Sequence, residues 1–276
     1  MTIEATGARY VSANGIDIHY VEAGAGEPLV LLHQGMVSTN PLWADSPVAY
    51  AGHMAVFAER FRVIAPDLRG CGRTANPDGG SISYAQLADD TAAMIDALGL
   101  EQPLVCGFSD GATLATILAV RNPGSVRAIV NHAGYDLLNP QAPSFAMARQ
   151  VLGGSPDAAE ADPAAAERFF ESSDQMRPLL DGMRAERGEG WKTILTQTYE
   201  RITTSPGYVF EDLRSITAPT LILAGDRDGF CSVEEGVEAY RMLGEGELAI
   251  LPGEGHVISP AAVEVSIDFL GRHAIR

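Results

Sequence analysis

The sequence predicts an α/β fold in which a mostly parallel central sheet is flanked by helices. Three observations lead to this fold class. Apolar runs of strand length recur along the chain, segments with apolar residues at helical spacing separate them, and one such junction carries the pattern G-x-S-x-G. Parallel strands need long crossover connections, which are usually helices, so this alternation is typical of a sheet covered on both faces.

The N-terminal elements are a hairpin followed by buried strands and a helix. Residues 8–22 form two alternating runs around an Asn-Gly pair, which favours a tight hairpin turn. Residues 29–33 and 62–67 are apolar runs that end in turn residues, so both are predicted to be buried strands. Residues 84–98 carry apolar side chains at helical spacing and are predicted to form a helix.

The alternation of strands and helices continues to the C-terminus, with one long interruption. Short apolar runs bounded by turn residues indicate the strands, and longer runs with helical spacing indicate the helices. The predicted strands are 103–106, 126–131, 218–224 and 247–251, and the predicted helices are 112–119 and 260–272.

The interruption spans 136–212 and contains no convincing buried strand. Its pattern predicts several helices separated by Pro, Gly and acidic residues, at 144–152, 163–171, 174–186 and 190–203. We therefore predict a core formed by 1–135 and 213–276, with 136–212 inserted between core strands as a helical cap, or lid. Such a cap would cover the carboxyl ends of the strands, where open α/β sheets bind ligands. The alternative is that these helices are ordinary packing elements.

The charge balance narrows the possible partners. The formal net charge is −17 and the isoelectric point is near 4.6, which describes an acidic surface. Such a surface repels nucleic acid and anionic membranes, so neither is expected as a partner. The expected partner is a small-molecule substrate, and a homodimer is possible.

Cysteine usage and the absence of targeting patterns bear on the compartment. The chain has three cysteines, Cys71, Cys106 and Cys231, which form no disulfide framework and lack the spacing of metal ligands. No metal is therefore expected. The N-terminus lacks a signal-peptide pattern, and no apolar run approaches the length of a membrane-spanning helix. We expect a cytoplasmic protein.

The G-x-S-x-G pattern is formed by residues 107–111, between an apolar run and a helix-compatible run. This context predicts a nucleophile elbow with Ser109 on a sharp turn between a buried strand and a helix. The flanking glycines are needed because close backbone approach leaves no room for a Cβ. The turn would expose the serine oxygen and direct the N-terminus of the helix toward the reacting atom.

A serine nucleophile needs a general base, and the base needs an orienting acid. His256 is the predicted base, because it lies in a glycine-rich turn after the last strand and before the last helix. Asp228 is the predicted acid, in the turn after the 218–224 strand, with Asp226 as its competitor in the same turn. The order Ser, acid, His along the chain is the one this architecture uses.

The oxyanion of a tetrahedral intermediate needs two N–H donors. The backbone N–H of Asp110, directly after the nucleophile, is predicted to be one of them. The second is predicted to come from the turn that follows the 29–33 strand, with Met36 favoured and Gln34 as the alternative. The Gln34 amide is also a candidate for contact with the substrate.

These segments together resemble the α/β-hydrolase superfamily. The resemblance rests on Leu-Leu-His-Gln-Gly at 31–35, Pro-Asp-Leu-Arg-Gly-Cys-Gly-Arg at 66–73, the Ser109 elbow, Gly-Asp-Arg-Asp at 225–228 and Gly-Glu-Gly-His at 253–256. It implies the α/β-hydrolase fold with a helical cap, and it supports Asp228, the second aspartate of its turn, as the acid. The Ser-Asp-Gly elbow is also similar to that of valacyclovir-hydrolase-like members, which cleave amino-acid esters.

The chain departs from this pattern at the oxyanion turn, where the family usually has His-Gly and this chain has His33-Gln34-Gly35. The resemblance implies a cofactor-free serine hydrolase, with a small or medium ester or lactone as the expected substrate. Carbon–carbon bond hydrolysis, a cofactor-free cyclase or tailoring activity, and a non-catalytic ligand-binding module are the alternatives. Epoxide hydrolases and haloalkane dehalogenases of this fold use an aspartate nucleophile, which Ser109 disfavours.

Several further side chains are candidates for the substrate pocket. The Asp110 carboxylate either holds a substrate ammonium group or simply stabilises the N-terminus of its helix. His132 and Tyr135 follow a core strand and either line the pocket or pack behind it. The residues predicted to form an apolar cavity under the cap, or alternatively a packed core, are Trp43, Phe145, Met147, Trp191 and Tyr199.

Overall fold

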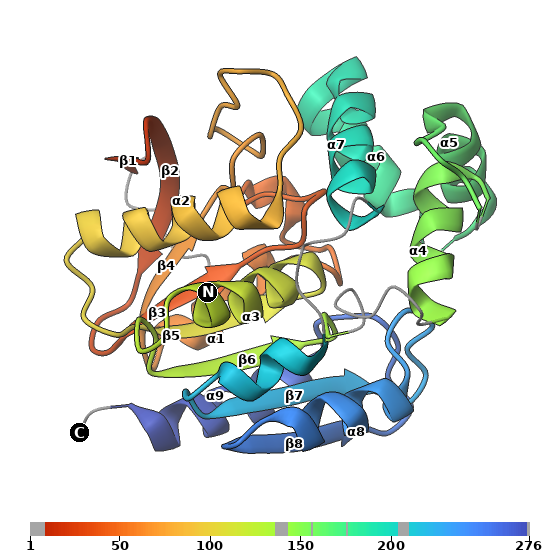
Figure 1. Cartoon of the computed structure of the whole chain (residues 1–276). Coiled ribbons are helices and arrows are strands. Elements are labelled where there is room, and N and C mark those ends of the chain that lie inside the picture. Colours follow the sequence, from red (N-terminus) through yellow and green to blue (C-terminus); the bar gives the residue numbers. More distant parts are fainter. Residues whose placement is uncertain (1–8, 136–142, 156, 175, 204–209, 275–276) are drawn as a thin grey trace.

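The computed structural model describes residues 9–135, 143–155, 157–174, 176–203 and 210–274. Within them, one eight-stranded sheet has the strand order β1-β2-β4-β3-β5-β6-β7-β8 (Figure 1). The strands are β1 (Arg9–Ala13), β2 (Ile16–Ala23), β3 (Pro28–Leu32), β4 (Arg62–Pro66), β5 (Leu104–Phe108), β6 (Ala128–His132), β7 (Thr220–Gly225) and β8 (Gly246–Leu251).

The sheet is parallel apart from its N-terminal hairpin. Strand β1 pairs antiparallel with β2, and β2 pairs antiparallel with β4. All pairings from β4 through β3 to β8 are parallel. Every residue of β5 and β6 is buried, as expected for central strands covered on both faces. The predicted fold class and the predicted positions of all these strands are confirmed.

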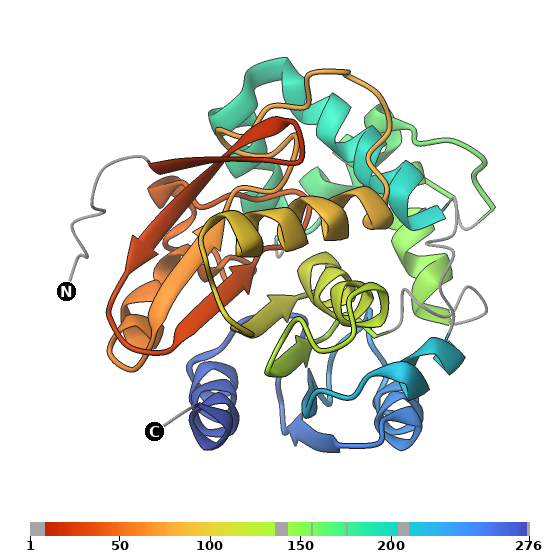
Figure 2. The ribbon, with the colours of Figure 1, turned by 60° about the vertical axis from the view of Figure 1, so that its left-hand side comes forward.

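Helices cover both faces of the sheet (Figure 2). Helices α2 (Tyr84–Ala97) and α3 (Asp110–Arg121) contact each other, and α1 (Met54–Ala58) contacts α9 (Pro260–His273). Helix α8 (Val233–Met242) packs on β7 and β8. The described 3₁₀ turns are η1 (Pro41–Trp43), η2 (Tyr50–Gly52), η4 (Gly188–Gly190) and η5 (Phe210–Ser215).

Helix α8 was not among the predicted elements, although the sequence carries a signal for it. Ser232 and Glu235 form a capping box, in which the serine hydroxyl accepts from the Glu235 N–H and the glutamate side chain accepts from the Ser232 N–H. The S-x-x-E spacing at 232–235 is the sequence mark of such a helix start. The helix is only ten residues long and half of these are charged or glycine, so its apolar pattern is a weaker signal than those of the predicted helices.

Among the described residues between β6 and β7 there are four α-helices, here called the inserted helices: α4 (Pro143–Gly153), α5 (Pro163–Ser172), α6 (Arg177–Arg187) and α7 (Trp191–Thr203). Figure 1 shows them gathered on one side of the sheet. Hydrogen bonds join them to the rest of the chain, for example the part-buried one from Trp43 Nε1–H to Glu186 Oε2 at 3.1 Å. The domain boundaries stay a prediction, and the expected start of the cap at 136 lies outside the described residues.

In the described part of the chain, no helix is both long enough and apolar enough to span a membrane.

Candidate active site

Ser109 lies on a strained turn between β5 and α3. Its backbone angles are φ 54° and ψ −123°, a combination that non-glycine residues rarely adopt. The turn is anchored because the Ser109 N–H donates to the His132 carbonyl oxygen at 2.8 Å. Strain of this kind persists where the surrounding structure enforces it, and it is common at functional sites.

The glycines of the elbow allow the strand and helix to approach closely. A Cβ on Gly107 would lie 2.2 Å from the Gly111 carbonyl oxygen, and a Cβ on Gly111 would lie 2.2 Å from the Leu32 carbonyl oxygen. Both distances are far inside van der Waals contact, so larger residues would force the turn apart. Two glycines around the serine are therefore required by packing, as the sequence predicts.

His256 reaches Ser109 from the loop between β8 and α9. Its Nε2 lies 3.0 Å from Ser109 Oγ, which is hydrogen-bond distance. The imidazole is held between two aromatic rings, with centroid distances of 4.8 Å to Phe108 and 4.9 Å to Phe230. This packing restricts the ring to an orientation that directs Nε2 toward the serine.

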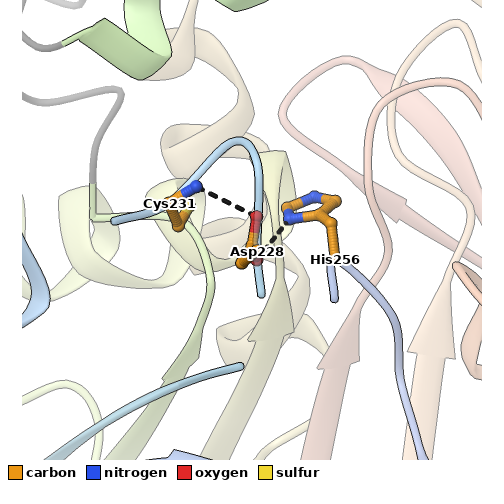
Figure 3. A group of neighbouring side chains, drawn as sticks. All are labelled: Asp228, Cys231 and His256. Carbon is orange, nitrogen blue, oxygen red and sulfur yellow. Dashed lines mark hydrogen bonds and ion pairs between the residues drawn. The ribbon is translucent and has the colours of Figure 1, made fainter. Parts of the chain in front are cut away.

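Asp228 completes the hydrogen-bonded chain from the turn after β7. Its Oδ2 lies 2.8 Å from His256 Nδ1, and its Oδ1 accepts from the backbone N–H groups of Phe230 and Cys231 at 2.8 and 3.0 Å. Figure 3 shows the carboxylate between the Cys231 nitrogen and the His256 ring. Burial favours a raised pKa for Asp228, but the charge and hydrogen bond of His256 and the two backbone donors hold this pKa below its ordinary value.

Asp226, the competing aspartate, has a different partner. Its Oδ1 accepts from the Gly253 N–H at 2.6 Å, across the turn that leads to His256. The structure therefore brings Ser109, His256 and Asp228 together and gives Asp226 a role in holding the loop.

Three potential metal ligands coincide with this site. Ligand atoms of Asp228, Cys231 and His256 all lie within 4.8 Å of one another. A metal ion binds neutral imidazole through an unprotonated nitrogen. A metal ion bound at His256 Nδ1 would replace the proton that this nitrogen shares with Asp228. The same atoms can therefore bind a metal or form the hydrogen bonds that lead to Ser109, but not both at once. The cysteine thiol is buried beside this chain.

The two predicted oxyanion donors lie at the same cavity. Asp110 begins α3 directly after the serine, and Met36 lies in the turn after β3. The Met36 N–H donates to Gln34 Oε1 at 3.1 Å. A carboxamide oxygen therefore occupies the hydrogen bond that a substrate oxygen would need from Met36, and Gln34 itself lines the cavity.

A cavity of about 410 Å³ opens beside Ser109 and His256, between the carboxyl ends of the strands and the inserted helices. Its wall is mainly apolar. The apolar residues that line it include Met36, Val48, Met147, Val151, Leu152, Phe169, Met176, Leu179, Ile202, Phe230 and Val257. Such a cavity accommodates a small or medium apolar group next to the serine.

The structure corrects three of the predicted substrate-binding residues, which are absent from the described cavity wall. Trp43 is buried because its ring packs on Gly182 of α6, where a Cβ would lie 2.4 Å from the ring. Tyr135 is buried and donates to the Ser232 carbonyl oxygen at 3.0 Å. His132 is buried in β6 against Phe108, and burial lowers its pKa to about 3. All three are packing residues because they point into the core.

The other residues for which a cavity and a packed core were the two alternatives divide between them. Met147 lines the cavity, whereas Phe145, Trp191 and Tyr199 are buried elsewhere among the described residues.

The Asp110 side chain has a partner that the sequence reasoning missed. Its Oδ2 accepts from Arg201 Nη2 at 2.6 Å, and its Oδ1 accepts from the Tyr84 hydroxyl. Burial opposes the charge of the guanidinium, but the Asp110 carboxylate raises the pKa of Arg201 above its ordinary value. No local motif marks Arg201, since its partner is far away in the sequence. In the sequence, Arg201 is a charged residue within a helix whose other buried side chains include Ile194, Leu195 and Ile202.

Comparison with known proteins finds relatives among hydrolases. Over 260 residues, 90% of this chain and 89% of the relative, the chain is 27% identical to 2-hydroxy-6-oxo-2,4-heptadienoate hydrolase of Pseudomonas putida. It is 37% identical over 109 residues to a soluble epoxide hydrolase of Corynebacterium sp. (strain C12), covering 40% of this chain and 35% of that enzyme. The solved enol-lactonase of Burkholderia xenovorans LB400 has a similar fold, with a TM-score of 0.72, 20% identity, and coverage of 95% of this chain and 100% of that one.

A family model described as alpha/beta hydrolase fold matches residues 28–262. The matched segment runs from β3 through β8 and includes Ser109, Asp228 and His256. The relative that aligns over 90% of this chain is also a hydrolase, which supports a hydrolase enzyme. The chain belongs to the alpha/beta hydrolase family.

Proposed function

We propose that this protein is a serine hydrolase that cleaves a small or medium apolar ester or lactone through an acyl-enzyme. The observation that carries the proposal is the hydrogen-bonded chain from Ser109 Oγ to His256 at 3.0 Å and from His256 to Asp228 at 2.8 Å, at the wall of a largely apolar cavity. In the proposed mechanism Ser109 is the nucleophile, His256 the general base and Asp228 the residue that orients the imidazole.

The proposed reaction has two balanced steps. Ser109 Oγ bonds to the substrate carbonyl carbon while its proton passes to His256 Nε2. The carbon–oxygen bond to the leaving group then breaks, and His256 returns that proton to the departing oxygen. A water molecule next attacks the acyl-enzyme, gives a proton to His256, and releases the acid as the proton returns to Ser109. Asp228 stabilises the imidazolium in each step.

The oxyanion hole in this proposal uses the backbone N–H groups of Asp110 and Met36. Each donor is expected to contribute roughly 2.7–4 kcal/mol to lowering the barrier. Because Gln34 Oε1 accepts from the Met36 N–H at 3.1 Å, the substrate oxygen has to replace the glutamine oxygen in that hydrogen bond. The Met36 N–H already binds an oxygen, that of the Gln34 side chain, which supports Met36 as a donor to a substrate oxygen.

Carbon–carbon bond hydrolysis is the second candidate. It is favoured by the similarity to 2-hydroxy-6-oxo-2,4-heptadienoate hydrolase, which extends over 90% of this chain. The same serine, histidine and aspartate would serve this reaction, so their geometry is equally compatible with it. A cyclase activity and a non-catalytic binding role have no specific observation in their favour.

The first test is covalent labelling with a fluorophosphonate probe, followed by mass mapping of the adduct. Labelling is expected on Ser109 in the wild type and is expected to disappear in Ser109→Ala and in His256→Ala. A folded wild-type protein that does not react would contradict the proposed activated serine.

Substrate class is then tested with purified wild-type protein. A panel of apolar esters and lactones is compared with 2-hydroxy-6-oxo-2,4-heptadienoate, with Ser109→Ala as the blank. We expect Ser109-dependent turnover of the esters or lactones. Turnover of the dienoate alone would favour the second candidate.

A further inference from the structure

A buried ion pair includes Asp110, the residue that follows the nucleophile. Asp110 follows Ser109 in the chain, and Arg201 comes from α7 of the inserted helices. Arg201 Nη2 donates to Asp110 Oδ2 at 2.6 Å, and the two side chains are only 4% and 6% exposed. An ion pair this well buried interacts more strongly than a surface pair, because water screens it little.

Both charges are also satisfied by neutral partners. The Tyr84 hydroxyl donates to Asp110 Oδ1, and the Arg201 guanidinium lies 5.6 Å from the centroid of the Tyr84 ring. Arg201 Nη2 lies 3.3 Å from Thr198 Oγ1. The pair is backed by Gly35, where a Cβ would lie 2.2 Å from Arg201 Nη2 and 2.3 Å from Asp110 Oδ2. The surroundings are thus shaped around the paired side chains.

Asp110 brings one half of the pair to the cavity wall, and Arg201 is buried next to it. Asp110 and Thr198 line the cavity, as does Ile202, the neighbour of Arg201 on α7. A substrate bound to Ser109 would therefore be close to any net charge at this position. In such a poorly hydrated place, an unpaired carboxylate would attract a cation, and an unpaired guanidinium would attract an anion.

We propose that the Asp110–Arg201 pair sets the charge selectivity of the cavity by keeping the wall beside Ser109 electrically neutral. Arg201 supplies the counter-ion that a cationic substrate would otherwise supply, and Asp110 cancels the positive charge that would otherwise attract an anionic one. The group that the substrate presents to this wall is therefore uncharged. This inference rests on the proposed serine hydrolase function.

The test uses three methyl esters that differ at one substituent of the α-carbon. They are methyl 3-phenylpropionate with hydrogen, phenylalanine methyl ester with an ammonium group, and the monomethyl ester of benzylmalonic acid with a carboxylate. The measured quantity is kcat/KM for each charged ester divided by kcat/KM for the neutral one. Intrinsic reactivity cancels when these ratios are compared between variants and wild type.

Opposite changes are expected for the two halves of the pair. Arg201→Met leaves the carboxylate unpaired, so the ammonium-to-neutral ratio should rise at least tenfold. Asp110→Asn leaves the guanidinium unpaired, so the carboxylate-to-neutral ratio should rise at least tenfold. The double variant removes both charges, and both ratios should return to within about threefold of wild type. Tyr84→Phe is the matched control, because it removes a partner of Asp110 but leaves the pair, and its ratios should stay at wild-type values.

Fluorophosphonate labelling of Ser109 separates the possible failures. A wild type that does not label contradicts the proposed function rather than the charge selectivity. Single variants that label normally but keep wild-type ratios would overturn the charge-selectivity proposal. If a single variant does not fold, the test uses the double variant and an inhibition measurement on the wild type. In the wild type, neutral 3-phenylpropanol should inhibit at a lower concentration than 3-phenylpropylamine, and the reverse order overturns the proposal.

Discussion

Two aspartates of one turn differ in their partners because their carboxylates point in different directions. Asp228 is 2.8 Å from His256 Nδ1, whereas Asp226 Oδ1 accepts from the Gly253 N–H at 2.6 Å. The first contact fixes the imidazole, and the second ties together the two loops that meet at the site. The residue type is the same, so position in the turn decides which partner each carboxylate contacts.

This difference predicts unequal effects of the same substitution. Asp228→Asn should lower kcat by about 10⁴-fold, because an amide cannot stabilise the imidazolium or keep Nδ1 as the protonated nitrogen. Asp226→Asn is the matched control and should keep kcat within about threefold, because its amide oxygen can still accept from Gly253. Steady-state kinetics on any ester turned over by the wild type checks both. Equal losses in the two variants would remove Asp228 from its proposed role.

At the scale of elements, one carboxylate joins the antiparallel hairpin to the parallel part of the sheet. Asp67 directly follows β4, and its oxygens accept from the Thr39 N–H and hydroxyl and from the Arg73 N–H, each at 2.8 or 2.9 Å. Its Oδ2 also lies 2.8 Å from His19 Nδ1 on β2. Burial favours a raised pKa, but these contacts together lower the pKa of Asp67 to about 2.

The lowered pKa predicts a pH-dependent contribution to stability. An unfolded aspartate has a pKa of about 3.9, so the folded state binds this proton less readily. The stabilisation is therefore complete above about pH 5 and is lost as the pH falls toward 2, by about 2 to 3 kcal/mol in total. Urea denaturation should show that Asp67→Asn lowers the free energy of unfolding at pH 6 and that its difference from wild type shrinks at pH 3. Asp45→Asn, which removes an exposed carboxylate, is the control, and a difference that grows on acidification would contradict the prediction.

For the whole molecule, the large negative net charge destabilises the folded state. The net charge of −17 includes 36 acidic residues against 19 Lys and Arg, so like charges repel over the folded surface. Buried ion pairs such as Arg69–Asp90, with two contacts at 2.7 Å, are screened much less by salt than this surface repulsion.

Added salt should therefore stabilise the protein. Raising NaCl from about 0.01 M to about 0.3 M should raise Tm by a few degrees at pH 7.5, because the Debye length falls from about 30 Å to below 8 Å. Differential scanning calorimetry measures the shift. The same change in salt at pH 5.5, closer to the isoelectric point near 4.6, should have a smaller effect. A fall in Tm at pH 7.5 would show that surface ion pairs outweigh the repulsion.

Local patterns in the sequence predict the fold class, the positions of the strands, and that Ser109, Asp228 and His256 lie close together. These predictions rest on local information: apolar periodicity, turn glycines and residues placed directly after strands. Parallel strands bring their carboxyl ends to one edge, so residues at those ends meet whatever the details of packing. The catalytic roles of these residues stay a proposal.

The surroundings of the serine depend on tertiary packing. It buried Trp43, His132 and Tyr135 in the core, and it paired Arg201 with Asp110. Both outcomes depend on how separate helices pack, which no local pattern encodes, because a buried aromatic or charged residue looks the same in sequence whether it faces a cavity or a neighbour. The character of the cavity wall, and with it the expected charge of the substrate, is a property of that packing.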